Sequence, residues 1–236
     1  MYLSRVVLRR GSQEAILQGM IHVAPDNLYE VLQGDVDWAT ANNYQIFFEG
    51  VKKHPAKKVA TANEAKIKKF LLFLLDLYPL VATALGISLQ KEKIKYPKDA
   101  INADIPLAEL TSQLDQNGFK CNFLLEMFKV NGRKELKKGM AEHFAKQGTV
   151  NALKGPNKWS LTSLFVWFFF RKAKPIILDY RNKVAVTKVE KHANGRHVFV
   201  HYGEKHIKGL VRLFQKAGWN VKEITYRNLA DYCEAS

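Results

Sequence analysis

The stretch 196–217, with the sequence RHVFVHYGEKHIKGLVRLFQKA, decides the fold that we expect for this chain. Its first half, 198–202, is an apolar and partly β-branched run, which is typical of a buried strand. Gly203 ends this strand, and from 207 onward apolar residues follow the spacing i, i+3, i+4, i+7 of a helix with one apolar face. His206 therefore falls on the turn between the carboxyl end of a strand and a helix. In open α/β sheets that edge is where ligands bind.

The same Gly-x-x-His spacing occurs a second time near the start of the chain. Gly19 and His22 lie at the end of the strand-like run 15–21. A third apolar run, 44–48, ends on Glu49. Three polar side chains thus leave three predicted strands, two of them with the same glycine spacing.

A short helix is predicted between the first and third of these runs. Asp26 is the expected N-cap and Gly34 the expected stop. Strand, helix and strand in this order form a βαβ unit, whose strands run parallel with a right-handed crossover. Parallel strands would put His22 and Glu49 at the same end of the sheet.

These elements predict an α/β fold with a mixed, mostly parallel central sheet flanked by helices. The runs 3–10 and 14–20 are joined by a turn and predict an antiparallel hairpin, which makes the sheet mixed. Apolar clusters between 62 and 160 follow a mainly helical pattern. We expect a single domain, 1–236, with a large helical insertion at 62–160 that serves as a lid or a substrate-recognition module.

The chain of 236 residues is strongly basic, with 37 Lys and Arg against 22 Asp and Glu and a net charge of +15. Such a charge favours acidic partners but says nothing about the fold. The lysine-rich stretch 51–69 contains no aromatic residue, so the base-stacking platform of a single-stranded nucleic-acid binder is missing. We therefore expect a solvated helix face there and no nucleic-acid partner.

Two apolar runs resemble membrane spans, but neither fits one. The run 70–89 contains Asp76 and Pro79, and the run 161–170 has about half of the roughly 20 residues that a spanning helix needs. The N-terminus, MYLSRVVLRRGSQEA, lacks the apolar core of a signal peptide. We expect a cytoplasmic protein without a transmembrane helix, and as a secondary feature a transient contact of 159–170 with an anionic membrane surface.

Two imidazoles and one carboxylate, from His22, His206 and Glu49, are expected to meet at the sheet edge. This set suits a divalent ion such as zinc, manganese, iron or cobalt and leaves positions open for water and substrate. Such an ion would lower the pKa of its bound water towards about 7 and polarise a carbonyl group. The alternative is that each residue is an ordinary hydrogen-bonded polar group at the end of a strand.

Four segments taken together resemble the TraB/PrgY/Tiki family. They are GMIHVAP at 19–25, IFFEGV at 46–51, DYRN at 179–182 and HVFVHYGEKHIKGL at 197–210. The resemblance covers about residues 4–55 and 175–225, and the middle of the chain departs from the pattern apart from Asn-Ala-Asp at 102–104. It implies a metal-dependent, peptidase-like hydrolase in which His22, His206 and Glu49 are essential. Glu49 would act as a metal ligand or as a general base.

Further residues are assigned supporting roles. Arg181 matches the arginine of the family's Arg-Asn pair and could hold a substrate carboxylate or stabilise an oxyanion, the alternative being a surface salt bridge. Tyr202 either donates a hydrogen bond or packs in the core. Asp104 is a candidate acidic group that reaches the site from the insertion. Gly19 and Gly203 are expected to let the backbone turn tightly beside the site.

Two other functions compete with the hydrolase. One is a non-catalytic module that captures a peptide or a small ligand, as the pheromone-silencing relatives in the family suggest. The other is a basic binder of nucleic acid or of an anionic surface, with an affinity that falls steeply with salt. The sequence leaves the substrate, the metal and the oligomeric state open.

Overall fold

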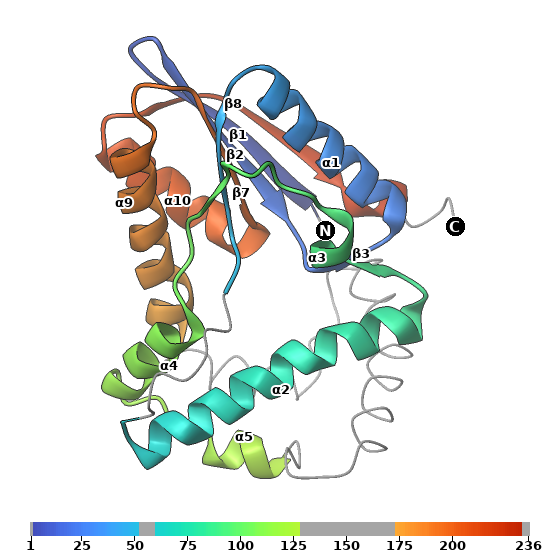
Figure 1. The fold of residues 1–236 in the computed structure, drawn as a ribbon, viewed down its shortest axis with the longest axis vertical. Helices are drawn as coiled ribbons and strands as arrows, with labels where there is room; N and C mark the ends of the chain where they lie inside the picture. Colours follow the sequence, from blue (N-terminus) through green and yellow to red (C-terminus); the bar gives the residue numbers. More distant parts are fainter. Residues whose placement is uncertain (1, 52–59, 128–172, 233–236) are drawn as a thin grey trace. The chain divides into compact units, whose positions relative to one another are not determined.

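The computed structural model describes residues 2–51, 60–127 and 173–232. The chain forms two compact units, both drawn in Figure 1. The first consists of Met1–Gly50, Ser88–Asp104 and Leu178–Ser236, and the second of Val51–Ile87 and Ile105–Ile177. Residues 88–104, which we expected within the helical insertion, belong to the first unit.

A six-stranded sheet forms the first unit, with the strand order β6-β4-β7-β2-β1-β8. Its strands are β1 (Tyr2–Arg10), β2 (Gln13–Met20), β4 (Gln45–Phe48), β6 (Ile101–Asn102), β7 (Val198–Gly203) and β8 (Asn220–Asn228). The neighbours β6, β4, β7 and β2 pair in parallel, whereas β1 pairs antiparallel with both β2 and β8. The predicted α/β fold with a mixed, mostly parallel sheet is confirmed.

The predicted βαβ unit is present, with one difference in pairing. The helix α1 (Asp26–Ala41) connects β2 to β4, and the two strands run parallel. They are not neighbours, because β7 lies between them and pairs with both. This arrangement inserts the strand of the second Gly-x-x-His motif between the strands that lead to His22 and Glu49.

The predicted end of α1 at Gly34 is wrong. The helix continues to Ala41, and its buried face continues with Val36 and Ala39. A glycine inside a helix costs only about 1 kcal/mol relative to alanine, so this apolar face outweighs it. The predicted N-cap is also wrong, because Asp26 is the first helical residue and Pro25 precedes it.

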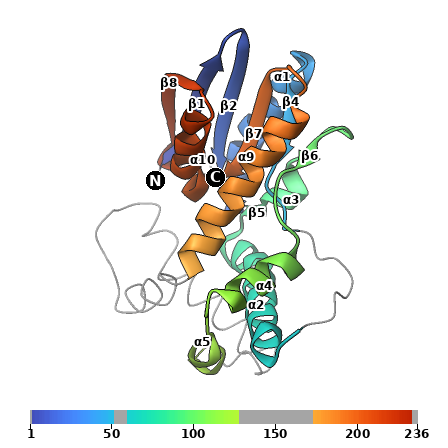
Figure 2. The same cartoon turned by 90° about the vertical axis from the view of Figure 1, so that its left-hand side faces the viewer.

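Helices cover both faces of the sheet. Figures 1 and 2 show α1 on one face and α9 (Arg181–His192) with α10 (Glu204–Lys216) on the other. The residues of β7 alternate between the faces, so that Val200 and Tyr202 belong to the core beneath α9 and α10. The predicted apolar face of α10 is buried in the same core, through Ile207, Leu210, Phe214.

Small elements complete the first unit. They are the paired strands β3 (Val23–Ala24) and β5 (Ser88–Leu89), the short helix α3 (Gln90–Lys93) and a 3-10 turn at Leu229–Tyr232. A π-helical turn at Pro175–Tyr180 contains Leu178, where the chain re-enters the first unit. Because β5 pairs with β3 just after His22, the segment from 88 onward lies beside the first Gly-x-x-His motif.

The second unit is helical where it is described. It contains α2 (Ala62–Leu85), α4 (Leu107–Gln116) and α5 (Asn122–Met127). Thr61 is the N-cap of α2, since its hydroxyl accepts from Glu64 N, and Glu64 Oε2 accepts from Ala60 N just before the cap. Among the described residues no helix is long and apolar enough to cross a membrane. The part of the predicted insertion after 127, and the stretch 159–170, lie outside the described residues.

Candidate functional site

Four neighbouring parallel strands end in polar residues at one edge of the sheet. In the order of the sheet, Asp104 follows β6, Glu49 follows β4, His206 follows β7 and His22 follows β2. Because parallel strands share the direction of their carboxyl ends, all four lie toward the edge where α/β proteins bind ligands. The predicted common edge for the two Gly-x-x-His motifs and Glu49 agrees with this topology. Asp104 belongs to the first unit and not to a helical insertion.

Arg181 is the centre of a buried cluster at this edge. Its Nε and Nη2 donate to the two carboxylate oxygens of Asp104 at 2.8 and 2.6 Å, and Nη2 also donates to Glu49 Oε1 at 2.5 Å. Arg181 is buried, so it does not form the surface salt bridge that was the alternative. Burial lowers the pKa of the guanidinium, but the two carboxylates outweigh burial and raise it, so Arg181 stays charged.

Glu49 is held ionised from two sides. Its Oε2 accepts from the backbone N–H of Gly203 at 2.6 Å, while Oε1 faces Arg181. Burial raises the pKa of this carboxyl, but the charge of Arg181, the two motif histidines and the Gly203 hydrogen bond bring it below the ordinary value. An ionised carboxylate can bind a metal ion or accept a proton as a general base, so this protonation state agrees with both roles expected for Glu49.

His206 is oriented by Asn182, the residue after Arg181. Its Nδ1 lies 2.7 Å from Asn182 Oδ1, and Asn182 Nδ2 donates to the His206 carbonyl at 3.3 Å. Since Oδ1 can only accept, Nδ1 carries the proton and Nε2 the lone pair. Nε2 lies 3.4 Å from Arg181 Nη1 and 3.8 Å from Glu49 Oε1. Burial lowers the His206 pKa to about 4, so the ring is neutral at pH 7.

Tyr202 is a packing residue in this arrangement. It is fully buried, and its ring meets the His206 ring edge-on at 5.0 Å between centroids. This contact limits the rotation of His206 and complements the hydrogen bond from Asn182.

The motif glycines are needed for space rather than for a turn, which corrects the role we expected. Neither Gly19 nor Gly203 has a positive φ. A Cβ on Gly203 would lie 2.8 Å from Glu49 Oε2, and one on Gly19 would lie 1.9 Å from Glu204 Oε2. Glu204 in turn accepts from Ser4 N and Ser4 Oγ at 2.7 and 2.6 Å. Each glycine therefore lets a carboxylate approach the backbone.

His22 lies at the margin of the site and is exposed. Its Nδ1 is 3.0 Å from Gln90 Oε1, and its carbonyl accepts from Gln90 N at 3.0 Å. As with His206, an amide oxygen faces Nδ1, which leaves the lone pair on Nε2.

Sequence reasoning missed three residues of this edge. Asn182 was visible in the DYRN motif but received no role of its own. Gly209 makes room for it, since a Cβ there would lie 2.2 Å from Asn182 Nδ2. Gln90 had no sequence signal at all, because only the pairing of β5 with β3 brings it to His22.

Imidazole and carboxylate, the side-chain types at this edge, are types that bind divalent cations. Both histidines face a side-chain amide oxygen with Nδ1, and that oxygen can fix the tautomer as carboxylates and backbone carbonyls do for metal-binding histidines. Glu49 is ionised and His206 is neutral at pH 7. The residues that the structure describes nevertheless contain no group of three or more His, Cys, Asp and Glu side chains arranged to hold a metal ion.

Comparisons of the chain with protein-family models, with curated proteins and with solved structures give no match. The likeness to the TraB/PrgY/Tiki family stays a prediction from the sequence motifs.

Proposed function

We propose that this chain is a metal-dependent hydrolase that cleaves an amide or ester bond in a peptide or another small substrate. The ending of four neighbouring parallel strands on His22, His206, Glu49 and Asp104 is the observation that supports this proposal most strongly. Such an edge is the common place for an active site in α/β proteins.

The protonation states of the cluster suit metal binding. A ligand must be deprotonated, and at pH 7 Glu49 is ionised while His206 carries a lone pair on Nε2. Nε2 of His22, Nε2 of His206 and the carboxylate of Glu49 would hold the ion, of which manganese, cobalt and zinc are the candidates.

The ion would supply a water of lowered pKa and polarise the bond to be cleaved. The chain's own residues supply position and charge. Asp104 fixes Arg181 through two hydrogen bonds, and Arg181 then fixes Glu49 Oε1. The guanidinium also keeps a positive charge inside the site, which stabilises the negative charge that develops on a carbonyl oxygen during hydrolysis.

Turnover of a peptide library tests this function. The metal-stripped protein is incubated with the library and with manganese, cobalt or zinc, and products are identified by mass spectrometry. We expect cleavage by the wild type that chelation abolishes, and a loss of at least about a hundredfold in Glu49→Gln and His206→Ala, because loss of a ligand exceeds loss of an outer partner. His192→Ala, an exposed position at the end of α9, is the matched control. Equal cleavage by all variants would contradict the assignment.

The second candidate is a non-catalytic module that binds a peptide or a small ligand. It is favoured by Arg181, whose guanidinium lies beside Glu49 Oε1 and His206 Nε2, where a metal ion would have to share its ligands. The same library separates the two functions. Peptides that bind and are recovered uncleaved with every ion would favour the module.

A further inference from the structure

A second series of polar residues leads from His22 into the core of the first unit. Gln90 Nε2 donates to the Tyr96 hydroxyl at 3.3 Å, and that hydroxyl lies 2.9 Å from His201 Nδ1. With the contact between His22 Nδ1 and Gln90 Oε1 at 3.0 Å, four side chains form a continuous series, which we call the His22 relay. None of the three inner residues belongs to the cluster around Arg181.

The hydrogen bonds of the relay run in one direction. The Gln90 amide gives its nitrogen to Tyr96, so its oxygen faces His22 and must accept from Nδ1. Tyr96 already accepts from Gln90, so its own proton points to His201 Nδ1. Burial raises the pKa of Tyr96 above its ordinary value, so the hydroxyl keeps this proton. Each residue donates to the next, from the site inward.

The inner end of the relay lies in the middle of the sheet. His201 is fully buried in β7, which pairs with β2 on one side and β4 on the other. Its Nε2 has no hydrogen-bond partner among the described residues. The ring of Tyr96 stacks on Phe48 at 4.3 Å, and Phe48 directly precedes Glu49. The strand that presents Glu49 therefore also fixes the residue that orients Gln90.

We propose that Gln90 and Tyr96 are positioning residues that hold His22 in the tautomer with the proton on Nδ1 and the lone pair on Nε2. His22 needs this support because, unlike the buried His206, it is exposed. The inference rests on the proposed function in one respect only, namely that the lone pair on Nε2 of His22 would bind a metal ion. The tautomer itself is a property of the metal-free protein.

Ring 15N–1H correlation spectra test the relay, because they distinguish a protonated ring nitrogen from one with a lone pair. The spectra are recorded on the metal-free protein at neutral pH, and the His22 signals are assigned with His22→Ala. We expect the Nδ1–H tautomer for His22 in the wild type. Tyr96→Phe and Gln90→Leu should shift the population to the Nε2–H form that a free imidazole prefers.

Two further variants keep the test decisive. Tyr44→Phe is the control, because the Tyr44 hydroxyl donates to Glu14 Oε1 and contacts none of the relay residues within the described structure. It should leave the His22 tautomer unchanged. Gln90→Glu keeps an oxygen facing Nδ1 and should retain the Nδ1–H form.

Either of two results would overturn the inference. One is His22 protonated on Nε2 in the wild type, a result that no folding defect of a variant can obscure. The other is the Nδ1–H form persisting in folded Gln90→Leu. The spectra are recorded without substrate or metal, so their result does not depend on whether the protein is a hydrolase.

Discussion

A single amide, that of Asn182, holds His206 at both its side chain and its backbone. Asn182 Oδ1 faces Nδ1 at 2.7 Å, and Nδ2 donates to the His206 carbonyl at 3.3 Å. The two residues belong to different helices, α9 and α10, which makes the orientation of the imidazole depend on how these helices pack. Gly209 allows the close approach.

Asn182→Ala should weaken metal binding and turnover by about 10–100-fold while the protein stays folded, because Nδ1–H loses the acceptor that fixes the ring. Metal affinity by calorimetry and kcat/KM against a cleaved peptide would measure this. Asn42→Ala is the control, since Asn42 is exposed and bonds only within its own helix end. Equal values for the two variants would contradict the role of Asn182.

Gly203→Ala should abolish turnover through Glu49. The new Cβ would lie 2.8 Å from Oε2, so the carboxylate has to leave the Gly203 N–H. Gly34→Ala is the matched control, because nothing lies within 4 Å of its Cβ and it sits inside α1. That control should stabilise the fold by about 0.5–1 kcal/mol. If Gly203→Ala keeps the activity of the wild type, turnover does not require the hydrogen bond between the Gly203 N–H and Glu49.

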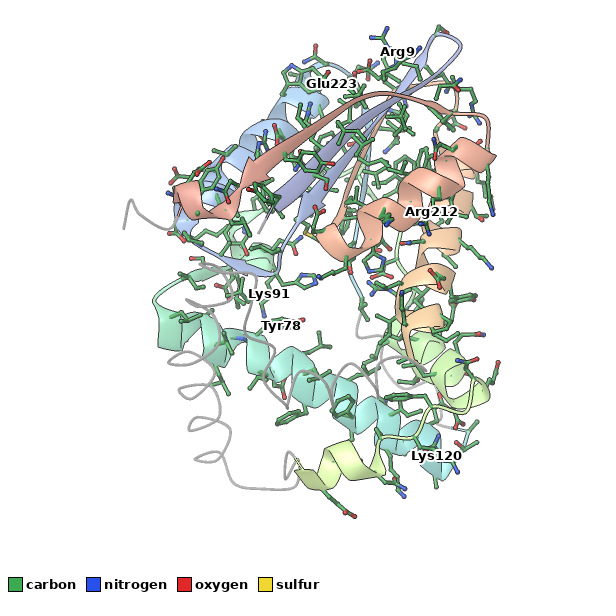
Figure 3. The ribbon with its side chains drawn as sticks, turned by 180° about the vertical axis from the view of Figure 1, so that it is seen from behind. Arg9, Tyr78, Lys91, Lys120, Arg212 and Glu223 are labelled. Atoms are coloured by element: carbon green, nitrogen blue, oxygen red, sulfur yellow. The ribbon has the colours of Figure 1, made fainter. Side chains whose placement is uncertain are left out.

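Arg181→Met should destabilise the protein by about 3–5 kcal/mol, because Glu49 and Asp104 would remain buried without their cation. Urea denaturation measures this loss. Adding Glu49→Gln and Asp104→Asn to the same chain should restore part of the stability, since no net charge is then buried. Arg212, which projects from α10 in Figure 3, is exposed and serves as the control, with Arg212→Met expected within about 0.5 kcal/mol of wild type. If the triple variant is no more stable than Arg181→Met, the two buried carboxylates are not the cause of the lost stability.

The stability of the protein should fall between neutral pH and about pH 4.5, partly because of His201. Burial lowers the His201 pKa from 6.5 to about 4, so the unfolded state binds more protons in this window and stability rises with pH there. His201→Gln should reduce the loss between these two pH values by about 2 kcal/mol. Denaturation at both pH values measures it, with the exposed His192→Gln as control. The same pH dependence in both variants would exclude His201 as the cause.

Local patterns predicted the strands β1, β2, β4 and β7 and their shared edge, but not β6, which lies in the stretch that we expected to be helical. The alternation at 198–202 and the helical spacing after it both lie within one short stretch, so neighbouring residues determine them. The strand order was not predictable in the same way. The sequence around 196–217 does not indicate that β7 lies between β2 and β4, because the strand order depends on pairing between segments that are distant in the sequence.

The supporting residues of the site were harder to predict than the motif residues. His22, Glu49 and His206 stand at the ends of apolar runs and can be found by spacing. Gln90 contacts His22 only because the chain returns to the first unit at 88–104 and β5 pairs with β3 there. The motif glycines could be found, but their reason could not, since the carboxylates that approach them come from other strands and helices.

Metal binding by the stripped protein tests the central claim most directly. Manganese, cobalt and zinc are titrated calorimetrically into wild type, His22→Ala, His206→Ala and the control His192→Ala. We predict near-stoichiometric binding of one ion per chain in wild type and control, and its loss in both motif variants. An affinity that neither motif substitution changes, or no binding of any of the three ions, would contradict a metal site shared by the two Gly-x-x-His motifs.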